Sequence, residues 1–363
     1  MVPQRAWRVW GSRLRHCVYP NGTLVALLPP DPWSADIDPQ RVQLYSSDAA
    51  DVYFARTRRV LELQGLKPMV TMEIFANAAG VLCGIREAAQ LLRHALAGGG
   101  EAWAAQEGES LRTKQVVLRI TGPYLSFGAY ETALLGMISH ATGWCTAARA
   151  VVEAAEGVPV ISFGARHVHP LISAAMEYAA IVGGCVTGAT PAGAKLGSAS
   201  PAGTMPHALV LIMGDTVEAA LAFDRHMDAL VPRIILVDTF RDEIEEALRV
   251  AEQMGSRLAG VRLDTPSERG GVSPELVHEL RARLDQAGYN AVRIFVSGGM
   301  TVARIAEFRL AKAPVDTFGV GDAIATAPPI AFTADIKEVE GRAVVKRGRI
   351  PGRTDEPSLQ RII

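Results

Sequence analysis

The second half of the chain alternates short apolar segments with amphipathic ones, and this alternation most restricts what the chain can fold into. We expect strands over 158–163, 184–187, 233–237, 258–263, 292–296 and 315–318. Helices are expected between them over 171–181, 242–254, 274–287 and 301–310. Strand–helix alternation builds a parallel sheet with helices outside it. Six strands in this span fit an irregular or incomplete barrel of the (β/α) type.

The first part of the chain has a mixed pattern that predicts a smaller α+β layer. Residues 1–50 lack periodicity, are rich in Pro and predict an extended or hairpin-like leader. The next residues predict helices over 49–64, capped by Asp48, and over 87–96, with strands over 67–75, 81–85 and 114–121. An Ala-rich helical stretch follows over 131–156, with a break expected at Gly143. We therefore predict an N-terminal α/β domain over residues 1–130 and a barrel domain over 131–330.

Composition and charge exclude several classes of protein. Of the 363 residues, 49% are hydrophobic and 21% are charged, which is enough apolar surface for a buried core. The formal net charge of -1 disfavours a nucleic-acid partner. The longest apolar stretches, such as 208–213, are too short to span a bilayer. The N-terminal arginines precede no apolar segment of the kind that a signal peptide carries, so we expect a cytoplasmic protein with no membrane partner.

The cysteines predict no metal centre. Cys17, Cys83, Cys145 and Cys185 lie far apart in sequence, so the chain has no CxxC pair and no zinc-ribbon spacing. Two disulfides could form, but a chain of this size does not need them. We expect four reduced thiols and no zinc site.

Polar residues and glycines directly follow the predicted strands. They are Arg166, His167 and His169 after the first strand, Thr190 after the second, Asp238 and Asp264 after the next two, Ser297, Gly298 and Gly299 after the fifth, and Gly319 and Gly321 after the last. The strands of a parallel barrel all end at the same mouth. We therefore expect a functional site there.

The two late glycine clusters predict a phosphate site. Glycine lets backbone N–H groups approach an anion, and a helix N-terminus adds a favourable dipole. Paired loops after the last two strands of a barrel often bind phosphate. The alternative is that each glycine marks only a tight turn.

Two carboxylates are also expected at this mouth. Asp238 and Asp264 follow neighbouring strands and suit Mg²⁺ or the hydroxyls of a ribose. The alternative is that each caps the helix or turn that follows it.

Basic side chains cluster after the first strand. Arg166 is a natural clamp for a carboxylate or phosphate, whereas His167 and His169 lack a third ligand for a metal. The alternative for His169 is a hydrogen-bonded residue before Pro170.

One further histidine lies at a predicted helix start. The segment from Gly203 to His207 predicts a cap at Thr204 and Pro206 in the first turn. His207 would lie at the positive helix end, where the neutral imidazole is favoured and suits a nucleophile or phosphoryl acceptor. A lone histidine in such a loop is more often structural.

At these residues the sequence resembles the nicotinate phosphoribosyltransferase family, in its short archaeal and bacterial form. The family has the type II phosphoribosyltransferase fold, which it shares with quinolinate phosphoribosyltransferase. The matching stretches are 51–57, 120–124, 162–170, 188–190, 203–207, 236–239, 260–264, 296–299 and 318–321. They occur in order over nearly the whole chain. The resemblance implies an N-terminal open-faced α/β sandwich, completed by residues 331–363, and an irregular α/β barrel.

The resemblance also implies an activity and its partners. The family joins nicotinate to 5-phosphoribosyl diphosphate, giving nicotinate mononucleotide and diphosphate in NAD salvage, with Mg²⁺ and with ATP hydrolysed as co-substrate through a phosphohistidine. An assembly of at least two subunits that can share active sites is implied too. The basic tail, with Arg342, Lys346, Arg347, Arg349 and Arg353, is then either a solvated strand face or a group that reaches diphosphate in a neighbouring subunit.

The resemblance assigns roles to particular residues. It implies the phosphohistidine at His207, the Tyr53 ring over the pyridine and Arg166 on the nicotinate carboxylate. Asp238 and Asp264 would surround the ribose and Mg²⁺ as catalytic groups. The 5′-phosphate would lie among Ser297, Gly298, Gly299, Gly319 and Gly321. The remaining substrate-binding residues would be His167, His169, Thr190, Lys195 and Thr204.

Two other functions stay open on the sequence. A quinolinate-type decarboxylating transferase would need more basic residues for a second carboxylate than the 166–169 group provides. A non-catalytic nucleotide-binding relative would not need His207, both carboxylates and both glycine loops.

Overall fold

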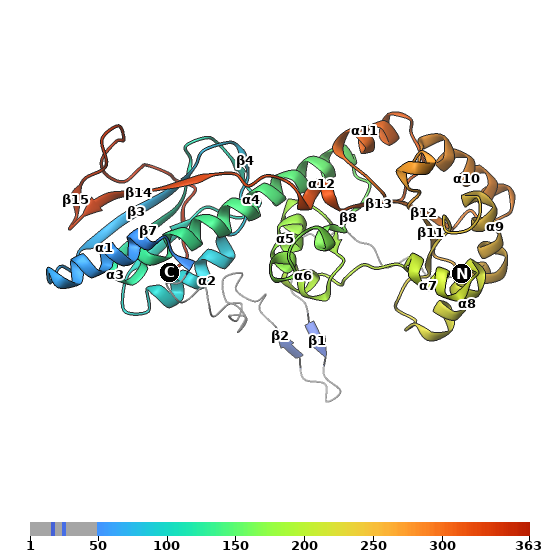
Figure 1. Cartoon of the computed structure of the whole chain (residues 1–363), viewed down its shortest axis with the longest axis horizontal. Helices are drawn as coiled ribbons and strands as arrows, with labels where there is room; N and C mark the ends of the chain where they lie inside the picture. The colour runs from blue at the N-terminus through green and yellow to red at the C-terminus, as the bar shows by residue number, and fades with distance from the viewer. Residues whose placement is uncertain (1–15, 19–23, 27–48) are drawn as a thin grey trace.

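The computed structural model describes residues 16–18, 24–26 and 49–363 and contains two large sheets (Figure 1). One is a parallel sheet of six strands and the other a mainly antiparallel sheet of six strands. Each sheet has its own hydrophobic core. Helix α4 (Glu131–Ala154) runs from one to the other, with Leu134 and Ile138 in the N-terminal core and Cys145 and Val151 in the core of the barrel.

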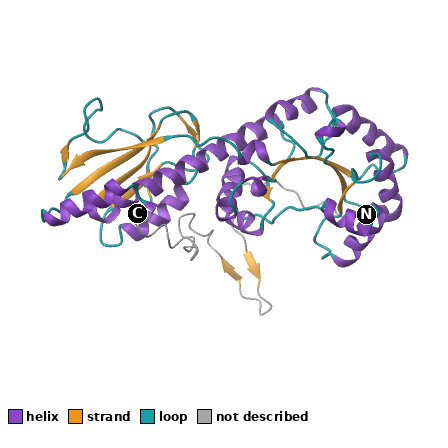
Figure 2. Cartoon of the chain, in the orientation of Figure 1, coloured by secondary structure: helices purple, strands orange, loops and turns teal. Residues whose placement is uncertain are grey.

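The parallel sheet curves into an arc that helices enclose on its outer side (Figure 2). Its strands, in spatial order, are β10 (Ile234–Leu236), β11 (Gly260–Leu263), β12 (Arg293–Val296), β13 (Thr317–Val320), β8 (Val160–Ser162) and β9 (Thr187–Gly188). The main outer helices are α5 (Pro170–Gly183), α8 (Thr216–His226), α9 (Glu243–Met254), α10 (Pro274–Gln286) and α11 (Val302–Leu310). Shorter helices are η4 (Gly164–His167), α6 (Pro191–Leu196), α7 (His207–Met213), η5 (Gly255–Arg257), η6 (Ser267–Arg269) and α12 (Asp322–Ala325). The predicted irregular barrel is confirmed.

Side chains alternate between the two faces of these strands, as a pleated backbone requires. Ile161, Ile234 and Phe295 face inward and pack together with Phe163 and Ala202. Their neighbours face the helices and join the main core. The inside of the barrel is therefore filled with side chains below the mouth.

The barrel is open between β9 and β10, which do not pair. Residues 200–206 cross this open side. The amide of Ala202 donates to the Gly188 carbonyl at 3.0 Å, and the Thr187 hydroxyl donates to the Ser200 carbonyl at 2.6 Å. This segment therefore closes the barrel without forming a strand.

The N-terminal sheet has the order β15 (Arg342–Ala343), β14 (Phe332–Val339), β3 (Met69–Ala76), β7 (Val116–Pro123), β5 (Glu101–Ala104) and β16 (Gln360–Arg361). Helix α2 (Ile85–Ala95) buries Ile85, Leu91 and Leu92 in its core. The domain also contains α1 (Val52–Leu63), α3 (Tyr124–Phe127), η3 (Gly128–Tyr130) and the pair β4 (Gly80–Val81) and β6 (Ser110–Leu111). Because β14 and β16 come from the C-terminal segment, residues beyond 331 complete this sheet.

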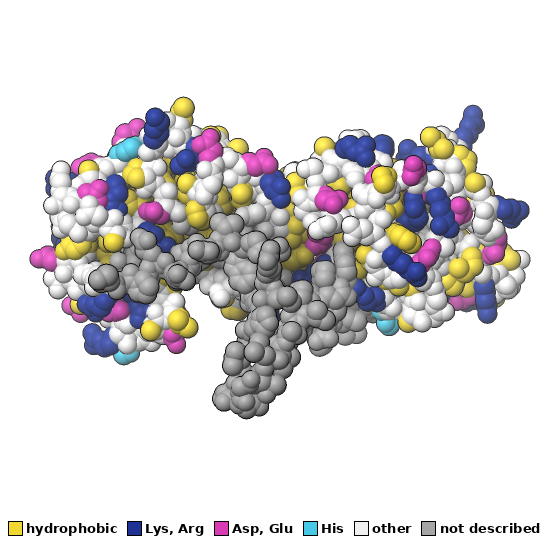
Figure 3. Space-filling view, turned by 180° about the vertical axis from the view of Figure 1, so that it is seen from behind, with side chains coloured by type: hydrophobic (Ala, Val, Ile, Leu, Met, Phe, Trp, Pro, Cys, Tyr) yellow, Lys and Arg dark blue, Asp and Glu magenta, His cyan; other side chains and the backbone are white. Residues whose placement is uncertain are grey.

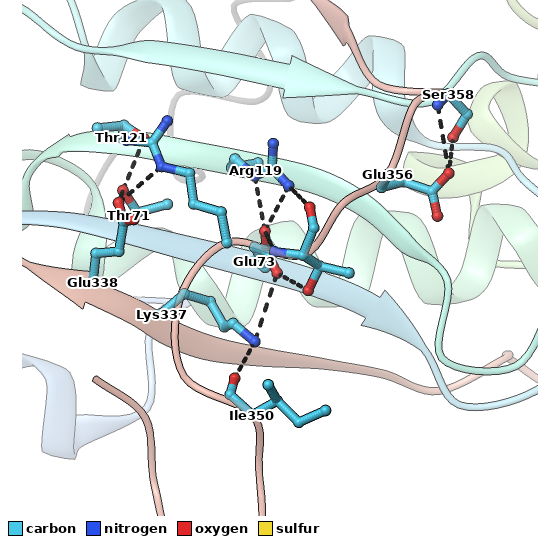
Figure 4. Close-up of polar contacts among 11 residues, drawn as sticks. Thr71, Glu73, Arg119, Thr121, Lys337, Glu338, Ile350, Glu356 and Ser358 are labelled. Atoms are coloured by element: carbon cyan, nitrogen blue, oxygen red, sulfur yellow. Dashed lines mark hydrogen bonds and ion pairs between the residues drawn. The ribbon is translucent and has the colours of Figure 1, made fainter. Parts of the chain in front are cut away.

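The C-terminal segment crosses the sheet from one edge to the other and is held there by buried charges (Figure 4). Glu73 is 1% exposed and accepts hydrogen bonds from Arg119 Nε at 2.8 Å and from the Thr354 amide at 3.0 Å. Lys337 Nζ donates to the Ile350 carbonyl at 2.6 Å. The segment is thus part of the folded domain.

The basic tail fits neither of the two expectations fully. Arg349 pairs with Asp335 at 3.0 Å and Arg353 pairs with Glu338 at 2.8 Å, both on β14. Arg342, Lys346 and Arg347 are exposed. Exposed Lys and Arg side chains are visible on the rear face of the N-terminal lobe (Figure 3). Two of the five charges therefore bind the sheet and three face solvent.

Several sequence predictions need correction. Helix α4 is continuous, because Gly143 serves a close approach: a Cβ there would lie 2.3 Å from the Pro328 carbonyl oxygen. The predicted strand 81–85 is only Gly80–Val81, and α2 begins at Ile85. The cap of α1 is Asp51, while the predicted cap Asp48 lies outside the described residues. Strands β5 and β6 and helix α8 are additional.

The hairpin-like leader is confirmed where it is described. Strands β1 (His16–Val18) and β2 (Leu24–Ala26) pair antiparallel. None of the helices in the described part of the chain combines the length and apolar character that crossing a bilayer requires.

Candidate active site

Polar side chains and glycines from five neighbouring strands lie at the mouth of the barrel. Asp238 follows β10, Asp264 follows β11 and Ser297 follows β12. Gly319 lies in β13, and the 163–167 segment follows β8. These strands pair consecutively, so the predicted carboxylates and glycine loops do meet at one place.

Arg262 is the centre of this group, and the sequence analysis did not single it out. Its Nε donates to Ser297 Oγ at 2.8 Å, its Nη1 to Thr204 Oγ1 at 2.9 Å and its Nη2 to Asp264 Oδ2 at 2.8 Å. Its guanidinium also lies 5.1 Å from the centre of the Phe163 ring. Burial lowers the pKa of Arg262, although the neighbouring carboxylates oppose that shift. The signal that could have found it is a charged residue inside the apolar strand 260–263.

Hydrogen bonds hold both carboxylate oxygens of Asp264. Its Oδ2 accepts from Arg262, and its Oδ1 accepts from Ser297 Oγ at 2.8 Å. The structure also ties the next residue down, because the Thr265 hydroxyl donates to buried Glu243 at 2.8 Å. The carboxylate is therefore held in one orientation before any ligand binds.

His207 faces the other carboxylate. Its Nε2 lies 3.2 Å from Asp238 Oδ1, and the Asp238 side chain is only 1% exposed. The hydrogen bond with Asp238 raises the pKa of His207, while partial burial opposes the shift. The adjacent carboxylate favours the charged form and so opposes the preference for a neutral imidazole that was expected from the helix end. With Nε2 in this bond, Nδ1 is the nitrogen left for another partner.

The second carboxylate oxygen of Asp238 indicates a place where a ligand would bind. Asp238 Oδ2 is buried and has no hydrogen-bond partner within the described structure. A buried carboxylate oxygen without a partner is costly, so it normally binds a donor or a cation. In the described residues no three His, Cys, Asp or Glu side chains group as a metal site, so a cation here would take most of its ligands from substrate or water.

The predicted phosphate residues divide into two kinds. Gly298 and Gly299 are exposed, have φ of 83° and 62° and precede α11, which Thr301 caps. Gly321 is half-buried and closely packed, because a Cβ there would lie 3.1 Å from His167 Nε2 and 3.2 Å from the Phe163 carbonyl oxygen. Gly319 is instead buried, and a Cβ there would lie 2.3 Å from the Phe163 ring. The Ser297 hydroxyl is engaged by Arg262 and Asp264, and its amide donates to the Leu263 carbonyl at 2.9 Å, so neither group is free for an anion.

The basic residues after β8 differ in their surroundings. Arg166 and His167 are exposed in η4, and the Arg166 charge is close enough to contribute to the lowered pKa of Arg262. His169 Nδ1 accepts from the Leu171 amide at 3.2 Å and caps α5. The structural alternative for His169 is therefore confirmed.

Three other predicted binding residues have local roles or distant positions. Thr204 does not cap α7, which begins after Pro206, because its hydroxyl accepts from Arg262 instead. The Thr190 hydroxyl accepts from the Gly193 amide at 3.1 Å and donates to buried Glu177. Lys195 is exposed on α6.

Tyr53 lies far from the mouth of its own chain. It is 54% exposed on α1, and α1 lies beside the N-terminal sheet at the other end of the molecule from the barrel (Figure 1). Its hydroxyl donates to Asp51 Oδ2 at 3.3 Å. The Tyr53 ring could therefore lie over a ligand only in a second subunit.

Comparison with known proteins agrees with this architecture. Residues 51–142 match the N-terminal domain of quinolinate phosphoribosyl transferase, and residues 145–335 match its C-terminal domain. The chain belongs to the quinolinate phosphoribosyl transferase family. The type II phosphoribosyltransferase fold predicted from the sequence is thereby confirmed.

Several proteins similar to this chain carry nicotinate in their names. The structure of nicotinate-nucleotide pyrophosphorylase from Pyrococcus furiosus is 42% identical, covers 88% of this chain and 81% of its own, and has a TM-score of 0.79. A nicotinate phosphoribosyltransferase of Mycobacterium tuberculosis is 31% identical over 70% of this chain and 56% of that relative. One of Bacillus subtilis is 27% identical over 62% and 46%. The chain thus spans about half the length of these curated relatives.

Proposed function

We propose that the chain is a nicotinate phosphoribosyltransferase. It would form nicotinate mononucleotide and diphosphate from nicotinate and 5-phosphoribosyl diphosphate, in NAD salvage, with hydrolysis of ATP. The observation that carries the proposal is the mouth itself, where the Arg262–Asp264–Ser297 group lies beside the His207–Asp238 pair. The names of the similar proteins above support the choice of nicotinate.

The reaction needs little acid–base chemistry from the protein. The pyridine nitrogen attacks the anomeric carbon with its own lone pair, the bond from that carbon to oxygen breaks, and diphosphate leaves with the electron pair. Positive charge grows on the ribose as this happens. Asp264, held in place by Arg262 and Ser297, would stabilise that charge through its orientation.

The pyridine would bind between charged and aromatic groups. The half-buried Phe163 ring, with the Arg262 guanidinium over it at 5.1 Å, offers one flat surface against which a pyridine would pack at the mouth. Arg166 is exposed next to them and supplies a forked donor for the carboxylate of nicotinate. Gly298, Gly299 and Gly321 would bind the 5′-phosphate with their amides.

The residues present fit a magnesium ion. Asp238 Oδ2 is the buried oxygen without a partner, and one carboxylate together with substrate phosphates is a usual arrangement for Mg²⁺. Asp264 contributes less readily, because both of its oxygens already accept hydrogen bonds. When bound, the ion would neutralise charge on the departing diphosphate.

ATP would act through His207. Its Nδ1 would attack the γ-phosphorus of ATP, so that a phosphorus–nitrogen bond forms, a phosphorus–oxygen bond breaks and ADP leaves. Asp238 would hold the ring through Nε2 and stabilise the positive charge on the phosphorylated imidazole. Water would later hydrolyse the phosphohistidine to free phosphate.

Labelled ATP tests this step. Incubation with γ-labelled ATP should leave an acid-labile, base-stable label on the protein, and His207→Ala should lose the label. The variant should keep slow transfer that no longer responds to ATP, because the displacement does not use the imidazole. Unchanged ATP stimulation in His207→Ala would contradict the assignment.

A quinolinate substrate is the second candidate, and the domain matches favour it. Product formation from nicotinate, quinolinate and nicotinamide, each with and without ATP, separates the candidates. The proposal requires nicotinate to give the highest kcat/KM and ATP to raise it. A preference for quinolinate with release of CO₂ and no ATP effect would replace it, and no turnover at all would favour a non-catalytic relative.

A further inference from the structure

Glu177 is a buried glutamate on α5 whose carboxylate accepts several hydrogen bonds from outside its own helix. Glu177 is 0% exposed. Its Oε1 accepts from the Ala189 amide at 2.7 Å, and its Oε2 accepts from the Thr190 amide at 3.0 Å and from the Thr190 hydroxyl. All of these donors belong to the loop that follows β9.

The loop sequence is adapted to this carboxylate. A Cβ at Gly188 would lie 2.7 Å from Glu177 Cδ, and a Cβ at Gly193 would lie 2.3 Å from Glu177 Oε2. Both positions must therefore be glycine for the loop to close around the side chain. Burying a carboxylate is costly unless donors satisfy it, so the loop and Glu177 fix each other.

This loop holds the segment that closes the open side of the barrel. The β9 residues Thr187 and Gly188 bind Ser200 and Ala202 through the two hydrogen bonds described above. This segment contains Thr204, whose hydroxyl accepts from Arg262, and it leads directly into His207. Hydrogen bonds and the short stretches of backbone between them thus connect Glu177 to the mouth.

We propose that Glu177 is a positioning residue that fixes the β9 loop and, through residues 200–206, places Thr204 and His207 at the mouth. The importance of this placement for catalysis rests on the proposed function, whereas the test measures structure and needs no activity. It also changes the expected role of Thr190. The hydroxyl of Thr190 donates to Glu177 and accepts from Gly193 at the start of α6.

The test uses Glu177→Gln, which keeps the size of the side chain but replaces an acceptor oxygen by a donor NH₂ group. Hydrogen exchange in the full-length protein should rise about tenfold or more at the Ala189, Thr190 and Ala202 amides. Amides in α9 should be unchanged. Glu252→Gln, an exposed glutamine substitution on α9, is the matched control and should leave all these amides as in the wild type.

The second readout is the NMR chemical shifts of the Thr204 and His207 amides at one fixed pH. If Glu177 places these residues, Glu177→Gln changes both shifts, whereas Glu252→Gln leaves them as in the wild type. Thr190→Val removes the hydroxyl that donates to Glu177 and accepts from Gly193. It should change the shifts in the same direction and serves if the glutamine variant does not fold.

Each outcome decides the proposal. Faster exchange confined to the β9 loop and residues 200–206, together with changed Thr204 and His207 amide shifts, supports it. Unchanged exchange, exchange that rises equally throughout the protein, or a loosened loop with unchanged Thr204 and His207 shifts overturns it. A wild-type protein that takes no label from ATP refutes the phosphohistidine alone, because neither readout depends on it.

Discussion

At the scale of single residues, the mouth depends on charges that restrain one another. Arg262 holds Asp264, Ser297 and Thr204, while Asp238 holds His207. Arg166 differs, because its guanidinium is exposed and makes no hydrogen bond with the described part of the chain. It is therefore the guanidinium most free to bind a substrate carboxylate.

Arg166→Ala should weaken nicotinate binding much more than binding of the phosphoribosyl donor. Losing one partner of a charge-assisted pair that the bound substrate shields from water costs on the order of 2–5 kcal/mol. The measurement is KM for each substrate with the other saturating. Arg225→Ala, an exposed arginine on α8, is the control. A normal KM for nicotinate with a raised KM for the donor would show that Arg166 binds phosphate instead.

Asp238→Asn should lower the pKa of His207 and change how stability depends on pH. In the wild type the folded pKa of His207 is raised above its unfolded value of 6.5. The stabilisation from the pair is therefore complete below about pH 6.5 and is lost as pH rises through the folded pKa. Urea unfolding from pH 5.5 to 9 should show a smaller decline in the variant. Equal slopes in both proteins would contradict the pairing.

At the scale of elements, one buried arginine organises the loop between α8 and β10. Arg233 is 9% exposed, pairs with Asp224 at 2.9 Å and donates to the carbonyls of Met227, Asp228 and Val231. Loop carbonyls that are buried need such donors. Arg257 binds the same Asp224 but is 53% exposed.

Arg233→Ala should lower the free energy of unfolding by about 3–5 kcal/mol, because it leaves Asp224 and several carbonyls without their donor. Arg257→Ala removes an exposed pair and should cost only about 0–1 kcal/mol. Urea denaturation at pH 7 measures both. Similar losses in the two variants would show that burial does not decide the contribution here.

The start of α4 carries a carboxyl group that should make the domain sensitive to pH. Burial, with smaller effects from Asp335 and Asp51, raises the pKa of Glu131 to about 7. The folded state therefore holds this proton more tightly, and the group lowers stability progressively as pH rises from about 4.5 through 7.

Glu131→Gln should therefore stabilise the protein more at pH 8.5 than at pH 5. Urea unfolding of the variant and the wild type at both pH values measures the difference. Glu153→Gln, farther along α4, is the control and should show no such change. A variant that gains nothing at pH 8.5 would contradict the raised pKa.

At the scale of the whole molecule, the distance between α1 and the barrel mouth favours sharing of sites between subunits. Helix α1 exposes Val52, Tyr53, Val60 and Leu63 and buries only Phe54. A surface helix with its apolar side chains exposed is typical of an interface. We expect at least a dimer in which Tyr53 of one subunit reaches the mouth of another.

Mixing two inactive variants tests this arrangement. Tyr53→Ala alters the N-terminal domain and Asp264→Asn alters the mouth, so a mixed dimer has one intact site. Activity should recover to about a quarter of the wild type after co-refolding at equal amounts. Each variant refolded alone should stay inactive at every protein concentration. A fully active monomer by light scattering, or no recovery on mixing, would refute site sharing.

The sequence by itself determined the main elements of the barrel and the mouth at which its polar residues and glycines meet. The alternation of apolar strands and amphipathic helices over residues 158–320 depends on local periodicity, so it predicted the barrel and put Asp238, Asp264 and the glycine clusters at one mouth. The open-faced N-terminal sandwich followed from the resemblance, since its C-terminal strand pairs with residues more than 200 positions earlier.

Tertiary structure alone decided which side chains share a hydrogen bond. The hub role of Arg262 depends on partners 35 and 58 positions away, and the Nε2 of His207 meets a carboxylate 31 positions away. Gly143 likewise lies within a continuous helix because Pro328 packs against it, and the raised pKa of His207 follows from its hydrogen bond with Asp238. Local sequence sets the backbone preference of each segment. Which side chains pair, and how their pKa values shift, depends on the residues that folding brings close together.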